Sequence, residues 1–126
     1  MKDKTFDYIV LSEILEHIQE PEKIMRIIKN RFNKNVIITI PNSGFILHRL
    51  RLLFGKFPVV VIVYHVKEHI RFWTHSDFRY WCKHLGYKVI SCQSSGGING
   101  LKFDLSKISL SLFAYGLLYQ ITRTDN

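Results

Sequence analysis

The feature that most constrains the fold is a pair of apolar strands separated by one short helix. "FDYIVL" (Phe6–Leu11) is almost continuously apolar, and "NVIITIPN" (Asn35–Asn42) repeats the pattern. Such continuous runs are typical of parallel strands that are buried on both faces. Pro21, between them, suits the first turn of a helix, where its missing N–H is not needed. Strand, helix and strand together predict a right-handed, parallel βαβ unit.

The helix after Pro21 is predicted to have one apolar face. Residues at helical spacing make that face: Ile24, Ile27, Ile28 and Phe32. A second helix is predicted over residues 45–54, and Gly55 ends it. The β-branched segment "PVVVIVY" that follows (residues 58–64) is either a strand or an extended lid.

The clearest helix is "WTHSDFRYWCKHLGY" (residues 73–87). Thr74 and Asp77 predict a capping box at its start, and Gly86 stands where a helix-ending glycine belongs. Strands are predicted at "YKVISCQ" and within "LSLFAYGLLYQITR", with a Gly/Ser-rich loop between them. We therefore expect a single α/β domain over residues 1–126. Its parallel strands would carry helices on both faces, and its last strand would be antiparallel.

Composition narrows the partners and the compartment. The net charge of +8 favours nucleic acid, an anionic membrane or a phosphorylated substrate, although an ordinary solvated surface explains it equally well. The two cysteines form neither a zinc spacing nor a disulfide framework, which is typical of a reducing cytoplasm. No apolar run approaches the ~20 residues of a spanning helix. We expect a cytoplasmic protein and leave peripheral membrane contact open.

The stretch "SEILEHI" lies where such folds place their sites. Ser12 and Glu13 follow the first strand, at the rim where α/β sheets bind ligands. On a helical turn, Glu13, Glu16 and His17 stand at i, i+3 and i+4, so their oxygen and nitrogen atoms could converge on one cation. The alternative explanation for these acidic residues is that negative charge near the start of a helix is stabilised by the helix dipole. Without a metal, His17 is a candidate general base or a positioning group for the acceptor.

Two longer stretches carry a family resemblance. "FDYIVLSEILEHIQEPEKIMRII" followed by "NVIITIPNSG" resembles the second half of a class I S-adenosylmethionine-dependent methyltransferase. "HRLRLLFGKFPV" and "HIRFWTHSDFRYWCKHLGY" resemble the methionine-biosynthesis and ubiquinone-pathway branch. The likeness covers residues 5–92 but lacks the family's opening strand and glycine-rich cofactor loop. It therefore implies the C-terminal portion of a methyltransferase domain, with an incomplete Rossmann-like sheet and a missing N-terminal half.

The resemblance also implies a site. Ser12 and Glu13 would lie near the methionine end of S-adenosylmethionine, and His17 and Glu13 would be the catalytic residues. Small-RNA 2′-O-methyltransferases and ubiquinone-pathway O-methyltransferases place magnesium on a Glu-x-x-Glu-His turn, which "EILEH" matches. The RNA enzymes add a histidine before a Phe-x-Trp-Thr-like stretch, which "HIRFWT" matches loosely. The implied ligands of Mg²⁺ or Mn²⁺ are Glu13, Glu16, His17 and His69.

The resemblance leaves the acceptor open. It implies methyl transfer to oxygen or nitrogen, on a small-molecule or phosphorylated substrate, by a larger or split enzyme. Tyr64, Phe72 and Trp73 are candidate walls of the acceptor pocket, with core packing as the alternative. A second hypothesis is a non-catalytic basic module that binds nucleic acid or an anionic membrane surface. Such a module would lose nucleic-acid affinity steeply with added salt.

The missing glycine-rich loop predicts that the isolated chain binds S-adenosylmethionine weakly or not at all. No other stretch of this sequence offers a glycine backbone that could approach the cofactor closely. Isothermal titration calorimetry measures this directly. A micromolar dissociation constant for the 126-residue chain would show that the cofactor site lies elsewhere in it.

Overall fold

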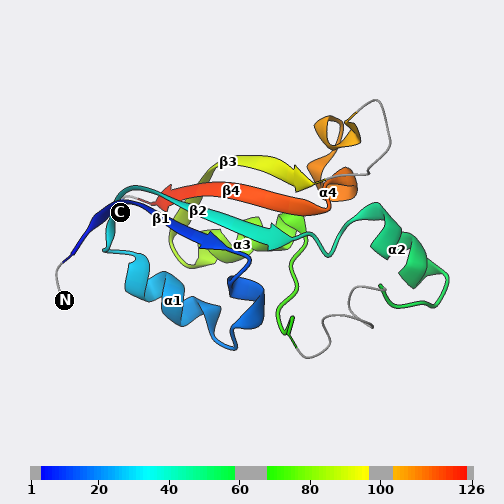
Figure 1. Ribbon diagram of the computed structural model, residues 1–126, viewed down its shortest axis with the longest axis horizontal. Coiled ribbons are helices and arrows are strands. Elements are labelled where there is room, and N and C mark those ends of the chain that lie inside the picture. Colours follow the sequence, from blue (N-terminus) through cyan, green and yellow to red (C-terminus); the bar gives the residue numbers. More distant parts are fainter. Residues whose placement is uncertain (1–3, 59–67, 97–103, 125–126) are drawn as a thin grey trace.

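The computed structural model describes residues 4–58, 68–96 and 104–124, which build a four-stranded sheet (Figure 1). Its strands are β1 (Phe6–Ser12), β2 (Phe32–Pro41), β3 (Tyr87–Gly96) and β4 (Gly116–Arg123). Their order is β1-β2-β4-β3. β1 pairs with β2 in parallel, whereas β4 is antiparallel to both β2 and β3. The last strand therefore runs against the others, as the sequence predicts.

Helices and short turns connect these strands. The helices are α1 (Pro21–Ile28), α2 (Ile46–Leu53), α3 (His75–His84) and α4 (Leu110–Phe113). The 3-10 turns are η1 (Leu15–His17) and η3 (Leu105–Lys107). None of the helices in the described ranges has the length and apolar character needed to cross a membrane. The predicted α/β class is confirmed, with α1 and α3 running alongside the sheet (Figure 1).

One face of the sheet carries the hydrophobic core. Its buried side chains are Leu11, Val36, Ile38, Ile40, Leu117, Tyr119 and Ile121. Met25 of α1 and Phe78 and Cys82 of α3 belong to the same cluster. Tyr8 and Val10, which alternate with the inward residues of β1, are 50% and 58% exposed. Among the described residues, the expected helix cover on both faces is therefore complete on one face only.

The predicted cap of α3 is present. The Thr74 side chain accepts the Asp77 backbone N–H at 3.2 Å, and the Asp77 carboxylate accepts the Thr74 N–H at 3.4 Å. At the other end, Gly86 has φ +79°, a left-handed conformation that glycine adopts without strain. The helix before Gly55 is also confirmed, because α2 ends at Leu53 and Gly55 has φ +71°.

The predicted apolar face of the first helix is wrong in two places. α1 ends at Ile28, and Phe32 opens β2, where its ring stacks on Tyr87 with centroids 6.4 Å apart. Ile27 is 68% exposed, and Met25 is the fully buried residue of the helix instead. The spacing from Ile24 to Phe32 misled because the turn after Ile28 breaks the helical period before Phe32 is reached.

The predicted last strand begins later than expected. Leu110–Phe113 forms the short helix α4, and β4 starts at Gly116. The Ser109 hydroxyl accepts the Leu112 N–H at 3.3 Å and so caps the turn locally. Residues 59–64 of "PVVVIVY" and residues 97–100 of the Gly/Ser-rich stretch lie outside the described ranges.

β1 forms one edge of the described sheet and carries exposed apolar side chains, so we predict that the isolated chain self-associates through it. Val10→Lys places a charge on this strand and should shift sedimentation-velocity profiles towards monomer. The matched control is Ile27→Lys, which charges an exposed apolar residue on α1. A monomeric wild-type chain with a cooperative melt would contradict the prediction.

Candidate active site

The end of β1 is tied to the end of β2. The Ser12 and Thr39 hydroxyls lie 2.9 Å apart, and the Glu13 backbone N–H donates to the Thr39 hydroxyl at 3.1 Å. Glu13 itself has φ +49°, a left-handed conformation that costs a non-glycine residue about 1–2 kcal/mol. Strained residues of this kind are concentrated at functional sites. Ser12 and Glu13 thus lie at the predicted rim.

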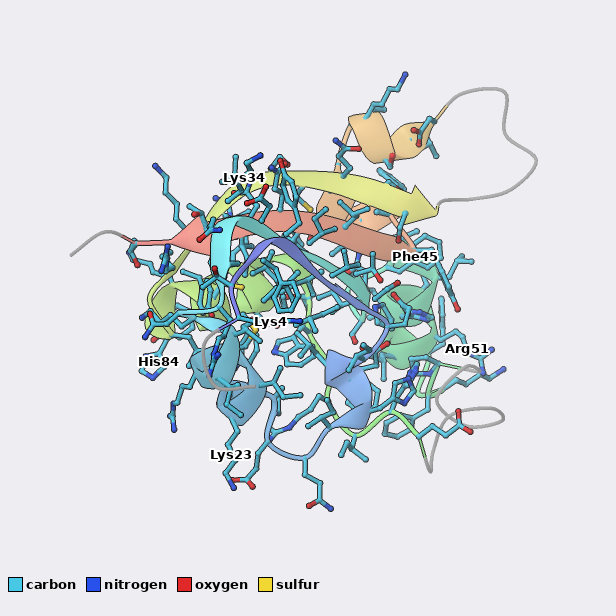
Figure 2. All side chains as sticks on the ribbon, turned by 60° about the vertical axis from the view of Figure 1, so that its left-hand side comes forward. Lys4, Lys23, Lys34, Phe45, Arg51 and His84 are labelled. Carbon is cyan, nitrogen blue, oxygen red and sulfur yellow. The ribbon has the colours of Figure 1, made fainter. Side chains whose placement is uncertain are left out.

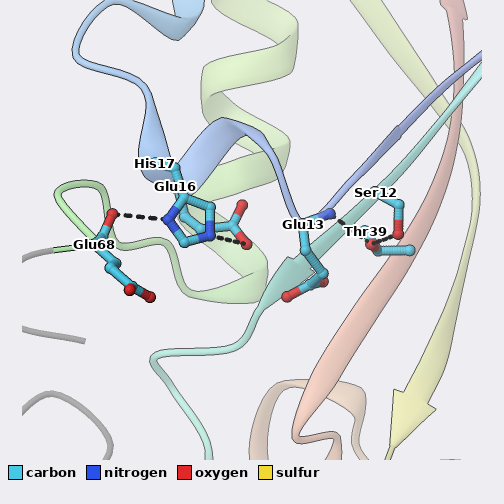
Figure 3. Close-up of polar contacts among 6 residues, drawn as sticks. All are labelled: Ser12, Glu13, Glu16, His17, Thr39 and Glu68. Carbon is cyan, nitrogen blue, oxygen red and sulfur yellow. Dashed lines mark hydrogen bonds and ion pairs between the residues drawn. The ribbon is translucent and has the colours of Figure 1, made fainter. Parts of the chain in front are cut away.

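The expected helical turn is shorter than the sequence spacing suggests. η1 spans only Leu15–His17, so Glu13 precedes the turn rather than lying on it. The Glu13 carboxylate nevertheless lies close enough to raise the pKa of Glu16 (Figure 3). Glu13 stands before this turn in a left-handed conformation rather than in a regular helix.

Glu16 is the most unusual residue of the site. Its side chain is 1% exposed, and neither carboxylate oxygen has a hydrogen-bond partner among the described residues. Burial raises the pKa of this carboxyl to about 7, and the negative charge of Glu13 adds to the rise. A buried carboxylate that, among the described residues, accepts no hydrogen bond and faces only one ion-pair partner, His17, destabilises a fold, so its presence at this rim is typical of a functional site.

The Glu16 main chain brings His69 to the same place. Its carbonyl oxygen accepts the N–H groups of Ile70 at 2.9 Å and Arg71 at 3.1 Å. The Arg71 guanidinium donates in turn to the carbonyl of Gln19. These contacts hold the segment after residue 68 against η1. The rings of His69 and His17 consequently meet edge to face, with centroids 4.6 Å apart.

The orientation of His17 is set by a backbone carbonyl. Its Nδ1 lies 2.8 Å from the Glu68 oxygen, and a carbonyl can only accept, so Nδ1 is the donor (Figure 3). In the neutral ring, the lone pair is therefore on Nε2, which lies 3.8 Å from Glu16 Oε1. A hydrogen bond of this kind is how metal-binding histidines are commonly oriented.

Three side chains present a ligand set for a cation. The oxygen or nitrogen atoms that Glu16, His17 and His69 can offer all lie within 4.8 Å of one another. The predicted proximity of His69 to the Glu16–His17 turn is thus observed, whereas Glu13 lies beside this group and not within it. The unpartnered carboxylate and the oriented Nε2 both fit a divalent cation. Mixed carboxylate and imidazole ligands suit Mn²⁺ and admit Mg²⁺.

A cleft opens over this group. Ser12, Glu13, His17 and His69 line it, together with residues that the sequence did not single out, including Thr39, Ser95 and Tyr115. Tyr115 precedes β4, and β4 runs antiparallel to β2, so its start lies at the rim where β1 and β2 end. The antiparallel direction predicted for the last strand was the signal that could have identified Tyr115.

Asn42 lies at the same rim but is fully engaged by the fold. Its buried amide donates to the carbonyls of Ser111 at 3.0 Å and Ala114 at 2.8 Å, and more weakly to Leu110. Its side-chain oxygen accepts the Gly44 N–H at 2.9 Å. Asn42 therefore joins the end of β2 to α4 and is not available to hold a ligand.

The predicted aromatic walls divide into two groups. Trp73 is buried in the core against Phe78 and Trp81, so core packing is its role. Phe72 is 51% exposed and lines a pocket beside the cleft. Tyr64 lies outside the described residues.

The strand order and the rim site together define a Rossmann-like methyltransferase fold. Residues 1–92 match the methyltransferase-domain family, and the chain therefore belongs to this family of class I S-adenosylmethionine-dependent methyltransferases. A small RNA 2′-O-methyltransferase of Tetrahymena thermophila is 31% identical over 104 residues, which are 76% of this chain and 23% of that protein.

Solved structures share the fold. The small RNA methyltransferase HEN1 superposes on 97% of this chain with a TM-score of 0.61 and 21% identity. A methyltransferase from Thermotoga maritima superposes on 99% with a TM-score of 0.62 and 13% identity. This chain spans 14% of the first protein and 58% of the second. It is thus much shorter than the proteins that it resembles.

Glu16 predicts a pH dependence of stability. Its folded-state pKa of about 7 exceeds the ordinary value of 4.5, so the folded state binds the proton more tightly. The free energy of unfolding should therefore fall as pH rises from 4.5 to 7, by about 3 kcal/mol at most. Glu16→Gln should flatten this slope in urea melts, whereas the exposed control Glu20→Gln should keep it. An unchanged slope in Glu16→Gln would contradict the assignment.

Proposed function

We propose that this chain is the acceptor-binding, C-terminal portion of a methyltransferase domain that methylates a hydroxyl with the help of a divalent cation. The acceptor is the ribose 2′-hydroxyl of RNA. The observation that carries the proposal is the buried Glu16 carboxylate, which accepts no hydrogen bond among the described residues and lies beside His17 and His69. The similarity to a small RNA 2′-O-methyltransferase supports the choice of acceptor.

Each residue of the site has a distinct role in this proposal. Glu16, His17 Nε2 and His69 hold Mg²⁺ or Mn²⁺, and the Glu68 carbonyl keeps His17 in the tautomer that this requires. A cation bound there would orient an acceptor hydroxyl and lower its pKa. Glu13 stands exposed at the cleft, next to the group, where its carboxylate can accept the hydroxyl proton.

In this proposal, residues at the neighbouring rim bind the cofactor. Ser12 and Glu13 line the cleft and would lie near the methionine end of S-adenosylmethionine. Bound S-adenosylmethionine would supply the electrophilic methyl group, and Glu13 would accept the proton that the acceptor hydroxyl loses when it is methylated. Alignment of the two reactants supplies most of the rate in such a transfer. The glycine-rich cofactor loop of the family does not occur within residues 1–126, so we expect these residues alone to transfer no methyl group.

A hydroxyl fits this site better than a nitrogen acceptor does. Lowering the pKa of the acceptor is of use for a hydroxyl, whereas an amine nitrogen already has a nucleophilic lone pair. The positive charge is spread over several elements, with Lys23 on α1, Lys34 on β2 and Arg51 on α2 (Figure 2). This distribution is suited to attracting a polyanion over much of the surface, rather than to binding it at a single basic patch.

Cation binding by the chain is the direct test. Manganese binding, followed by electron paramagnetic resonance, should be lost in Glu16→Gln and His69→Ala. The loss should exceed the roughly 10–100-fold effect typical of changes outside the coordination shell. The matched control is His84→Ala, an exposed histidine at the end of α3, away from η1 (Figure 2). Equal manganese affinity in Glu16→Gln would refute the proposed site.

The acceptor is tested by the effect of the cation on RNA binding. Manganese should strengthen binding of a short single-stranded RNA, measured by fluorescence anisotropy, because the ribose hydroxyl joins the ligand set. The same oligonucleotide with 2′-deoxyribose should show no such gain. If both oligonucleotides respond equally to manganese, the hydroxyl is not the group that the site holds.

A further inference from the structure

A second, apolar pocket opens next to the cleft. Its walls come from His48 and Leu52 on α2, from Phe57 after that helix, and from Phe72. It shares Pro41, His69 and Tyr115 with the cleft. The two hollows therefore adjoin at these residues, so the apolar pocket lies next to any molecule that the Glu16–His17–His69 group holds.

The aromatic walls of this pocket are held by a buried ring. Phe45, which is 3% exposed, contacts Tyr115 and His48 edge to face, with centroids 5.5 Å and 5.6 Å away. Tyr115 and His48 also face each other at 6.1 Å. Tyr115 remains 43% exposed. Core packing thus fixes the position of these rings without covering them, which is what a stacking surface for a planar ligand needs.

Arg51 lies beside the apolar pocket, whereas the acidic Glu13 and Glu68 line the neighbouring cleft. Arg51 of α2 donates from Nε to the Phe57 carbonyl at 2.8 Å, which ties the pocket wall to the helix. Burial and the nearby Arg51 lower the pKa of His48, which favours the neutral form of its ring. A neutral ring stacks on a planar base, and an adjacent guanidinium attracts a phosphodiester.

We propose that this pocket holds the nucleobase of the nucleotide being methylated and that Tyr115 and His48 position it. The inference rests on the proposed function, because a ribose carries its base and its 2′-hydroxyl on adjacent carbons. When the 2′-hydroxyl lies at the Glu16–His17–His69 group, the base therefore lies against Pro41, His69 and Tyr115, the wall that the cleft and the pocket share. Stacking accepts any base, so the pocket confers a requirement for an unpaired nucleotide rather than for a sequence.

Mononucleotides test the pocket in the full chain. In Mg²⁺, adenosine 5′-monophosphate should bind at least about fivefold more tightly than ribose 5-phosphate, the lower end of what stacking of one base supplies. Tyr115→Leu and His48→Leu should remove this difference, and Tyr115→Phe should keep it. The matched control is Tyr80→Leu, at an exposed tyrosine on α3 away from the pocket, which should also keep it. Isothermal titration calorimetry measures all of these affinities.

The outcomes separate the pocket from the proposed function. Equal affinity for the two ligands, with manganese binding intact, would overturn the base pocket alone. A retained base preference in a chain that does not bind manganese would overturn the metal-dependent function and leave a base-binding site. Stronger competition by 4-butylphenol than by adenosine 5′-monophosphate would make the pocket a site for an apolar acceptor and overturn the proposal.

Discussion

The parallel pairing of β1 with β2 determines where every residue of the candidate site lies. It brings Ser12 opposite Thr39, so that the ends of the two strands share one rim and their hydroxyls meet at 2.9 Å. The antiparallel β4, paired with β2 through residues 116–121, adds its own beginning to the same rim. Residues from all four strands therefore line the cleft, and η1 follows β1 at that point.

Stability and function oppose each other at Glu16. Its main-chain carbonyl stabilises the site by accepting two N–H groups from the segment around Ile70. Its side chain does the reverse, because a buried carboxylate without a hydrogen-bond partner is unfavourable until a proton or a cation neutralises it. The same residue thus assembles the site and leaves there a buried charge that a proton or a cation would neutralise.

Local patterns in the sequence predicted local structure well. The capping box at Thr74 and the glycines at 55 and 86 depend on hydrogen bonds and backbone angles within a few residues, so α2 and α3 were predicted near their observed limits. Predictions failed where a spacing pattern crossed a boundary. Phe32 continues the helical spacing of α1 in the sequence but pairs with β1 as part of β2. The apolar stretch before β4 forms α4, whose end is fixed by a hydrogen bond from the Asn42 amide to the Ala114 carbonyl.

The sequence by itself determined the kinds of atom at the site and their order along the chain. Carboxylate, imidazole and the helix and strand signals around them are properties of neighbouring residues. Only the tertiary structure decided that Glu16 is buried, that His17 presents Nε2, and that His69 lies beside both. The physical reason is that these outcomes depend on contacts between residues about fifty positions apart, such as His17 with Glu68. Burial and hydrogen-bond partners of that kind exist only once the sheet has brought distant segments together.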